Sequence, residues 1–146
     1  MILHEDINNI EYRCSTPVQL RFNDIDMLGH VNNTIYFSFF DLAKSDYFNR
    51  VNNGVVEWDD VPIVIANINC DFIAPVTFDE QIEIKTAVES IGDKSFRLVQ
   101  VLVNSTTGEL KCLCRTVMVY FDTTTRIPIS VPQQWRDSIA QYERGE

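Results

Sequence analysis

The sequence is poor in residues that break or cross-link a chain. Only five glycines and five prolines occur among 146 residues, which excludes a collagen-like or low-complexity chain. The four cysteines, Cys14, Cys70, Cys112 and Cys114, are too few for a dense disulfide framework and lack the two-plus-two spacing of a zinc site. We therefore expect reduced cysteines and no bound metal.

Long apolar runs and basic residues are also lacking. No run approaches the roughly twenty residues that cross a membrane, and residues 1–6 lack the pattern of a secretion signal. The 12 lysines and arginines stand against 21 acidic residues, so the formal net charge is −9. Because neutralising phosphates supplies most nucleic-acid affinity, we expect no nucleic-acid partner. We expect a soluble, cytoplasmic protein with no membrane partner.

Apolar side chains are plentiful, and 45% of residues are hydrophobic, which suits a single domain over residues 1–146. From about residue 34 to residue 50 they cover more than one stripe of a helix, so this helix needs to be enclosed. Asn32 or Asn33 is the expected N-cap, and Asn53-Gly54 the expected left-handed stop. Asp41 and Lys44 suit an exposed i,i+3 ion pair.

Alternating apolar residues predict about five strands. The first contains Val18, Leu20 and Phe22, and the others lie near residues 64–72, 82–88, 99–103 and 113–121. Hairpin turns at Gly92-Asp93 and Thr107-Gly108 make the later strands antiparallel neighbours. Near the C-terminus, helical spacing predicts a small amphipathic helix that contains Trp135, Ile139 and Tyr142.

One long apolar helix and about five antiparallel strands favour an α+β hotdog fold, in which a curved sheet wraps around the helix. Such a sheet leaves an edge strand and apolar surface uncovered. We therefore expect two subunits to pair edge to edge, as a homodimer or within a homotetramer.

The junction from Asp24 to Asn33 combines carboxylates, glycine, imidazole and amides between the first strand and the long helix. A helix start offers backbone N–H groups that no intrahelical carbonyl accepts. A carboxylate placed just before that start is therefore able to face a carbonyl group that these donors polarise.

The run from Arg21 to Asn33, with its Asp-x-Asp-x-x-Gly-His-Val-Asn-Asn core and Tyr36 beyond it, resembles the signature of the 4-hydroxybenzoyl-CoA thioesterase family of hotdog acyl-CoA thioesterases. Supporting matches lie at residues 72–76, 94–96 and 121–122, and the resemblance covers about residues 16–132. It implies that Asp26 is the catalytic carboxylate and that the Asn33 backbone N–H points at the thioester carbonyl. Either general-base or nucleophilic action by Asp26 fits this chemistry.

The neighbouring residues have structural explanations as well as functional ones. Asp26 also suits a helix cap or an Asx turn, and Asp24 is expected to be a solvated turn residue outside the catalytic set. Two explanations account for Gly29: the backbone adopts a positive φ there, or the substrate approaches the backbone closely. His30 orients water, contacts the acyl group or satisfies a backbone carbonyl. Tyr36 lines the acyl pocket or belongs to the core.

Coenzyme A carries phosphates that need cations on a surface rim. The candidates are Lys94, Arg97, Arg115 and Arg126. Some relatives carry a basic cluster where this chain has Gly92-Asp93, so the nucleotide is held more weakly here or by other residues. An acyl carrier protein is itself acidic and fits this acidic chain poorly, which favours acyl-CoA as the substrate.

The sequence thus predicts an acyl-CoA thioesterase that releases a free acid and CoA and uses no cofactor. The alternative is a module that binds or senses acyl-CoA without hydrolysing it. A hotdog dehydratase or hydratase uses a different Asp/His spacing, which this chain lacks. Aromatic residues of the long helix suit either an aryl or an alkyl pocket.

Overall fold

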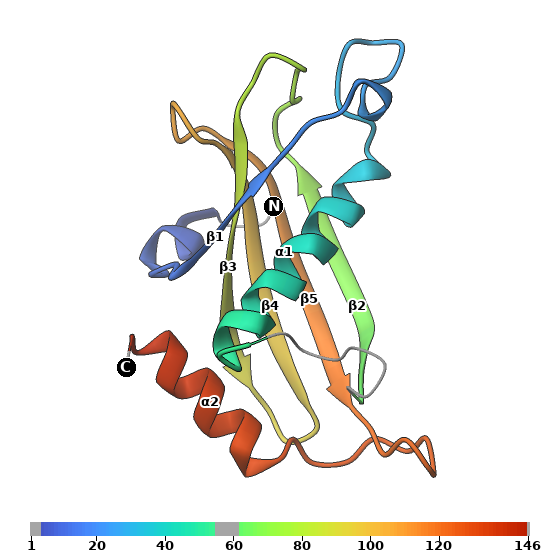
Figure 1. Ribbon diagram of the computed structural model, residues 1–146, viewed down its shortest axis with the longest axis vertical. Helices are drawn as coiled ribbons and strands as arrows, with labels where there is room; N and C mark the ends of the chain where they lie inside the picture. Colours follow the sequence, from blue (N-terminus) through green and yellow to red (C-terminus); the bar gives the residue numbers. More distant parts are fainter. Residues whose placement is uncertain (1–3, 55–61, 146) are drawn as a thin grey trace.

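The computed structural model describes residues 4–54 and 62–145 (Figure 1). Residues 1–3, in the segment where no secretion signal is expected, lie outside the described range. The elements, in chain order, are the 3-10 helix η1 (His4–Asn9), β1 (Cys14–Val18), the 3-10 helix η2 (Phe22–Asp24), α1 (Ile35–Val51), β2 (Ile63–Phe72), β3 (Ile82–Ile91), β4 (Ser95–Asn104), β5 (Leu110–Tyr120) and α2 (Gln133–Glu143).

The five strands form one antiparallel sheet in the order β1-β3-β4-β5-β2. Figure 1 shows α1 lying across one face of this sheet, so the predicted α+β hotdog fold is confirmed. Both predicted hairpin turns are present: the Gly92 N–H donates to the Ser95 carbonyl at 2.7 Å, and Gly108 has a φ of 77°. The two edges of the sheet are β1 and β2.

Helix α1 is buried on the side that faces the sheet, but Phe37 and Leu42 are 40% and 54% exposed, so the prediction of an enclosed helix is wrong for the single chain. Its buried side chains include Tyr36, Phe40 and Phe48. The predicted stop is confirmed, since Asn53 has a φ of 54° and the Gly54 N–H donates to the Asn49 carbonyl.

The start and the charged face of α1 differ from expectation. The N-cap position is Thr34, and Asn32 supports it from two residues earlier, where its Oδ1 accepts from the Thr34 N–H at 3.0 Å. The Lys44 ammonium pairs with Asp41 at 3.4 Å, but Lys44 is only 5% exposed. The prediction of an exposed pair is therefore right for Asp41, whose side chain is 64% exposed, and wrong for Lys44.

The face of the sheet opposite α1 is covered in part. Ile7, Ile10 and Tyr12 pack on the outward-facing side chains of β4 and β5, opposite α1. The predicted C-terminal helix is confirmed as α2: Ile139 is buried, and Trp135 lies against Phe48 of α1.

The first strand lies earlier in the chain than the alternation predicts, because β1 begins at Cys14. Val18 and Leu20 are buried as expected, but β1 ends at Val18, and Phe22 is 84% exposed within η2. The cause is Asp24, whose carboxylate accepts a hydrogen bond from the Arg21 N–H at 2.8 Å. This contact stabilises η2 where the alternation predicts the end of the strand.

Candidate active site

The acidic motif folds into a compact turn between η2 and α1. Ile25 and Val31 form an isolated antiparallel bridge, the Asp26 N–H donates to the His30 carbonyl at 2.9 Å, and the Gly29 N–H donates to the Asp26 carbonyl at 3.1 Å. Gly29 has a φ of 79°, and a Cβ at this position would meet nothing within 4 Å. Of the two explanations for Gly29, the positive φ is therefore the one the geometry supports.

The Asp26 carboxylate has two different oxygens. Oδ1 accepts hydrogen bonds from the Leu28 N–H at 2.9 Å and the His30 N–H at 3.4 Å, which makes the expected Asx turn. Oδ2 accepts no hydrogen bond within residues 4–54 and 62–145. One oxygen therefore fixes the side chain, and the other is available to a ligand.

Asp26 borders a groove of about 320 Å³. One wall comes from the turn and the beginning of α1, and the other from the segment that follows β2. The lining residues are Asp26, Leu28, His30, Val31, Asn32, Asn33, Tyr36, Phe72, Ile73, Ala74 and Pro75. Four of the predicted site residues are thus brought together, namely Asp26, His30, Asn33 and Tyr36, whereas Gly29 belongs to the turn but does not line the groove.

The Asn33 backbone N–H is a free donor beside this groove. The next two amides are occupied, because the Thr34 and Ile35 N–H groups donate to the Asn32 side chain and carbonyl at 3.0 and 2.9 Å. Within the described part of the chain, no acceptor faces the Asn33 N–H. A donor at a helix start polarises a carbonyl group placed against it.

Tyr36 is both a core residue and part of the groove wall. Its ring is buried and meets the ring of Phe72 edge to face at 5.2 Å. Burial raises the pKa of the Tyr36 hydroxyl to about 12, so it stays neutral at physiological pH. Tyr36 and Phe72 therefore give the groove an uncharged aromatic surface.

Asp24 is not the solvated turn residue that we predicted. It is 1% exposed, its Oδ2 accepts from the Arg21 N–H, and its carbonyl accepts from the Asn32 N–H at 2.9 Å. The prediction failed because the carboxylate is held by Arg21, whose N–H bonds to Oδ2 and whose guanidinium group lies 3.5 Å from Oδ1. Asp24 holds the two ends of the turn together and does not line the groove.

The wall formed by residues 72–75 was not among the predicted site residues. The available signal was the match at residues 72–76, together with the end of the apolar alternation at Phe72. Neither observation says that this segment faces the acidic turn, because that contact is distant in sequence.

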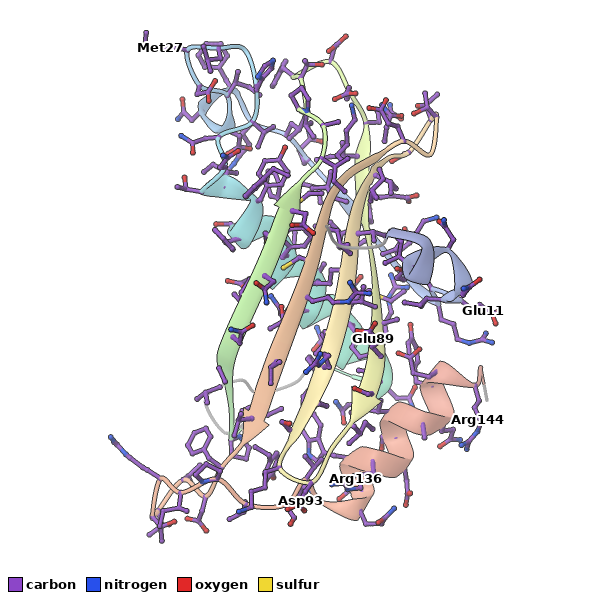
Figure 2. All side chains as sticks on the ribbon, turned by 180° about the vertical axis from the view of Figure 1, so that it is seen from behind. Glu11, Met27, Glu89, Asp93, Arg136 and Arg144 are labelled. Atoms are coloured by element: carbon purple, nitrogen blue, oxygen red, sulfur yellow. The ribbon has the colours of Figure 1, made fainter. Side chains whose placement is uncertain are left out.

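The lysine and arginine side chains predicted to bind the CoA phosphates do not line the groove. Lys94 is in the turn between β3 and β4, and Figure 2 shows the neighbouring Asp93 at the opposite end of the sheet from Met27 of the acidic turn. Arg97 lines a separate hollow of about 300 Å³ on the outer face, together with Arg115. The groove gathers neither Lys94 nor Arg97, so their role in binding CoA phosphates stays a prediction.

The described residues hold neither a metal-ligand cluster nor a membrane-spanning helix. Within residues 4–54 and 62–145, no three His, Cys, Asp or Glu side chains are grouped so that they could hold a metal ion. None of the described helices is both long and apolar enough to cross a membrane. All four cysteines are free thiols.

Known proteins are similar to this chain in sequence. YsmA of Bacillus subtilis strain 168, an uncharacterized protein, is 31% identical over 81 residues, which cover 56% of this chain and 54% of that protein. The long-chain acyl-CoA thioesterase FadM of Escherichia coli strain K12 is 23% identical over 129 residues, covering 86% of this chain and 96% of FadM.

Among solved structures, a thioesterase from Thermus thermophilus, complexed with coenzyme A and Zn, superposes with a TM-score of 0.81 at 25% identity. The superposition covers 92% of this chain and 96% of that one. A family model described as the thioesterase-like superfamily matches residues 20–140, which include the acidic turn, α1 and the whole groove. The chain therefore belongs to the thioesterase-like superfamily.

Proposed function

We propose that this protein is an acyl-CoA thioesterase that hydrolyses an acyl or aryl thioester to a free acid and CoA. The observation that carries the proposal is the pairing of the free Oδ2 of Asp26 with the free N–H of Asn33 along one groove. A carboxylate and an amide donor are what thioester hydrolysis requires, since neutral water is a poor nucleophile and the carbonyl oxygen becomes negative as it is attacked.

In the general-base route, Oδ2 of Asp26 takes a proton from a water molecule as the water oxygen bonds to the thioester carbon. The carbonyl oxygen becomes an oxyanion that accepts a hydrogen bond from the Asn33 N–H. When the C–S bond breaks, the sulfur leaves with the electron pair, and the proton on Asp26 returns to it. The products are the acid and the CoA thiol.

In the nucleophilic route, Oδ2 itself bonds to the thioester carbon, and the CoA thiolate leaves. The product is a mixed anhydride between Asp26 and the acyl group, which water then hydrolyses. Both routes use the same oxygen of Asp26 and the same N–H of Asn33, so the groove serves either one. General-base catalysis contributes typically ~10²–10⁴-fold, and one oxyanion donor about 3 kcal/mol.

The groove and the relatives support acyl-CoA as the substrate class. Tyr36 and Phe72 present aromatic surface to the acyl group, which suits an aryl or alkyl chain. FadM is named a long-chain acyl-CoA thioesterase, and the Thermus protein holds coenzyme A. Closer kinship with the 4-hydroxybenzoyl-CoA thioesterases is supported by the run from Arg21 to Asn33.

We also propose that the active form is a homodimer or homotetramer in which copies pair along β2. This strand is an edge of the sheet, and its Val64 and Ile65 are 47% and 42% exposed. Unpaired edges with apolar side chains favour pairing with another chain. Ile65→Lys is expected to lower the mass measured by sedimentation, and an unchanged mass would rule out this edge.

The second candidate function is a module that binds acyl-CoA without cleaving it. An open groove serves binding as well as catalysis, and the Asp26 side chain already has a structural task in the Asx turn. The two functions differ in what happens to the bound thioester.

The test incubates the purified protein with a panel of aliphatic and aryl acyl-CoA thioesters and measures released thiol with a colour reagent. The variant Asp26→Asn keeps the Oδ1 acceptor of the turn and removes only the charge. Turnover that falls ~10²–10⁴-fold in Asp26→Asn supports the thioesterase. Binding of acyl-CoA without thiol release by the unmodified protein identifies the sensor and overturns the proposal.

A further inference from the structure

One wall of the groove lies outside the sheet. Residues 73–81 connect β2 to β3, and Ile73, Ala74 and Pro75 of this connection line the groove without belonging to a strand. A segment outside the sheet ladders is held only by individual contacts. The residue that supplies most of these contacts is Lys111, at the beginning of β5.

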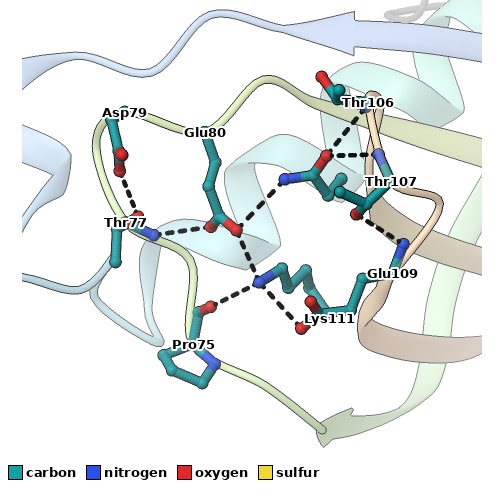
Figure 3. Close-up of polar contacts among 9 residues, drawn as sticks. Pro75, Thr77, Asp79, Glu80, Thr106, Thr107, Glu109 and Lys111 are labelled. Carbon is teal, nitrogen blue, oxygen red and sulfur yellow. Dashed lines mark hydrogen bonds and ion pairs between the residues drawn. The ribbon is translucent and has the colours of Figure 1, made fainter.

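Lys111 binds this segment through both its main chain and its side chain. Its carbonyl accepts hydrogen bonds from the Ile73 and Ala74 N–H groups at 2.9 and 3.1 Å. Its ammonium group, on a side chain only 6% exposed, donates to the Pro75 carbonyl at 3.1 Å (Figure 3). Lys111 therefore contacts all three wall residues in succession.

Two carboxylates complete the surroundings of the ammonium group. Oxygens of Glu80 and Glu109 lie 2.7 and 3.1 Å from Nζ of Lys111. Together with the Pro75 carbonyl, these are three acceptors for the three N–H bonds of an ammonium group. The buried charge is thus compensated by two carboxylates and a main-chain carbonyl.

Glu80 extends the network toward the acidic turn. Its second oxygen accepts from the Thr77 N–H at 2.9 Å, and the first also accepts from the Asn104 side chain at 3.3 Å (Figure 3). Thr77 forms an isolated bridge with His30, and the Val76 carbonyl accepts from the Val31 N–H at 2.8 Å. The far wall and the turn that carries Asp26 are therefore joined through residues 76 and 77.

We infer that Lys111 is a positioning residue, which sets the distance between the wall at residues 73–75 and the Asp26 turn and thereby the fit of the acyl-CoA in the groove. This inference rests on the proposed function. Lys111 does not line the groove, so it acts through the residues it holds and not on the thioester. Small displacements of positioning groups cost large factors in rate or binding.

The charges of this network persist across the working pH range. Burial by itself would lower the pKa of Lys111, but its hydrogen bonds with Glu80 and Glu109 outweigh burial and raise it. Burial would raise the pKa of Glu80, and its bonds with Lys111, Thr77 and Asn104 lower it instead. The ion pair therefore stays charged through neutral pH.

The test compares Lys111→Met, which removes all three donors, with Lys111→Arg, which keeps a cation. The matched control is Arg136→Met. Arg136 also donates to main-chain carbonyls, those of Gly92 and Asp93 at 2.7 Å, but at the end of the sheet away from the groove (Figure 2). For each variant, kcat and KM with an acyl-CoA that the unmodified protein hydrolyses are measured, together with amide hydrogen exchange and the unfolding midpoint.

For Lys111→Met we expect KM to rise about tenfold or more while kcat changes less than about threefold, because the wall binds the substrate and does not react with it. The Thr77 and Val31 amides should also exchange faster in Lys111→Met. In Lys111→Arg, both KM and the exchange rates should lie closer to those of the unmodified protein. Arg136→Met should leave KM and these amides unchanged. If Lys111→Met fails to fold, Glu80→Gln provides the same comparison with a smaller expected rise in KM.

The inference is overturned if Lys111→Met keeps the KM and the exchange rates of the unmodified protein, or if Arg136→Met changes KM equally. Failure of the proposed function gives a different result, because the unmodified protein would then release no thiol from any acyl-CoA. In that case the exchange rates of the Thr77 and Val31 amides still decide whether Lys111 holds the wall.

Discussion

Two turns at opposite ends of the sheet have nearly the same construction (Figure 1). In one, Oδ1 of Asp26 accepts from the Leu28 and His30 N–H groups, and Gly29 closes the turn with a φ of 79°. In the other, Oδ1 of Asp122 accepts from the Thr124 and Thr125 N–H groups at 2.8 and 3.0 Å, and Arg126 has a φ of 59°.

The surroundings of the two turns differ. The Asp26 turn leads into α1, so a free helix-start N–H lies beside it, and residues 72–75 face it across the groove. The chain after the Asp122 turn goes back to the sheet, where Pro128 bridges Phe121. An aspartate that closes an Asx turn is therefore not a site in itself; the donor and the opposite wall make it one.

The largest expected effect is on kcat, and it distinguishes two single variants that each remove one turn aspartate's charge. Asp26→Asn should lower kcat ~10²–10⁴-fold, because the Oδ2 that accepts the proton or attacks the thioester is lost. Asp122→Asn should leave kcat unchanged, because no groove residue depends on that turn. Steady-state thiol release measures both, and equal kcat values for the two variants would contradict the distinction between the turns.

The helix start of the Asp26 turn is tested through the backbone of Asn33. Asn33→Pro removes the N–H and should lower kcat ~10²–10³-fold, the cost of one oxyanion-hole donor. Asn33→Ala keeps the N–H and should remain within a few-fold of the unmodified protein. Both variants are first checked for a native unfolding midpoint, and similar losses in both would mean that the side chain is what acts.

Substitutions at the two positive-φ residues, Gly29 and Arg126, should differ by a smaller amount, in the free energy of unfolding. Gly29→Ala should lower the free energy of unfolding by about 1 kcal/mol, because an L-residue with a Cβ is strained in the left-handed region. Arg126→Ala replaces one strained non-glycine residue with another and should stay within about 0.5 kcal/mol. Urea unfolding measures both changes, and an equal loss at the two sites would refute this explanation of Gly29.

The smallest expected effect is the pH dependence of the Asp122 turn. Hydrogen bonds from the Thr125 and Thr124 N–H groups lower the pKa of Asp122. A lowered pKa stabilises the folded state above the unfolded pKa of about 4, and this contribution is lost as the pH falls through the folded pKa. The unfolding midpoint of Asp122→Asn should therefore lie below that of the unmodified protein at pH 7, and this gap should shrink at pH 2. A gap of equal size at both pH values would contradict this.

Local patterns in the sequence were enough to locate most strands and the long helix. Period-two alternation located β2 to β5, and the crowded apolar positions after Thr34 located α1. Errors arose where a side chain bonds to the backbone or packs at a distance. Asp24 turns the chain after β1 through the Arg21 N–H, where the alternation predicted a strand, and the burial of Lys44 depends on how α1 meets the sheet.

The candidate site was predictable on one side only. Asp26, His30, Asn33 and Tyr36 lie within one short run, so a motif identifies them together. The opposite wall comes from the end of β2 and the segment after it, and Lys111 comes from β5, so only the folded chain brings them next to that run. Lys94 and Arg97 were chosen for their charge and for lying in the strand region, which does not specify the end or the face of the sheet on which they lie.

The most direct test of the proposed chemistry is a crystal structure of Asp26→Asn with an uncleaved acyl-CoA bound. We predict that the thioester carbonyl oxygen lies about 3 Å from the Asn33 nitrogen, with the carbonyl carbon beside the residue 26 side chain. A thioester bound away from the groove, or a carbonyl oxygen that faces other donors while residue 26 points into solvent, would contradict it.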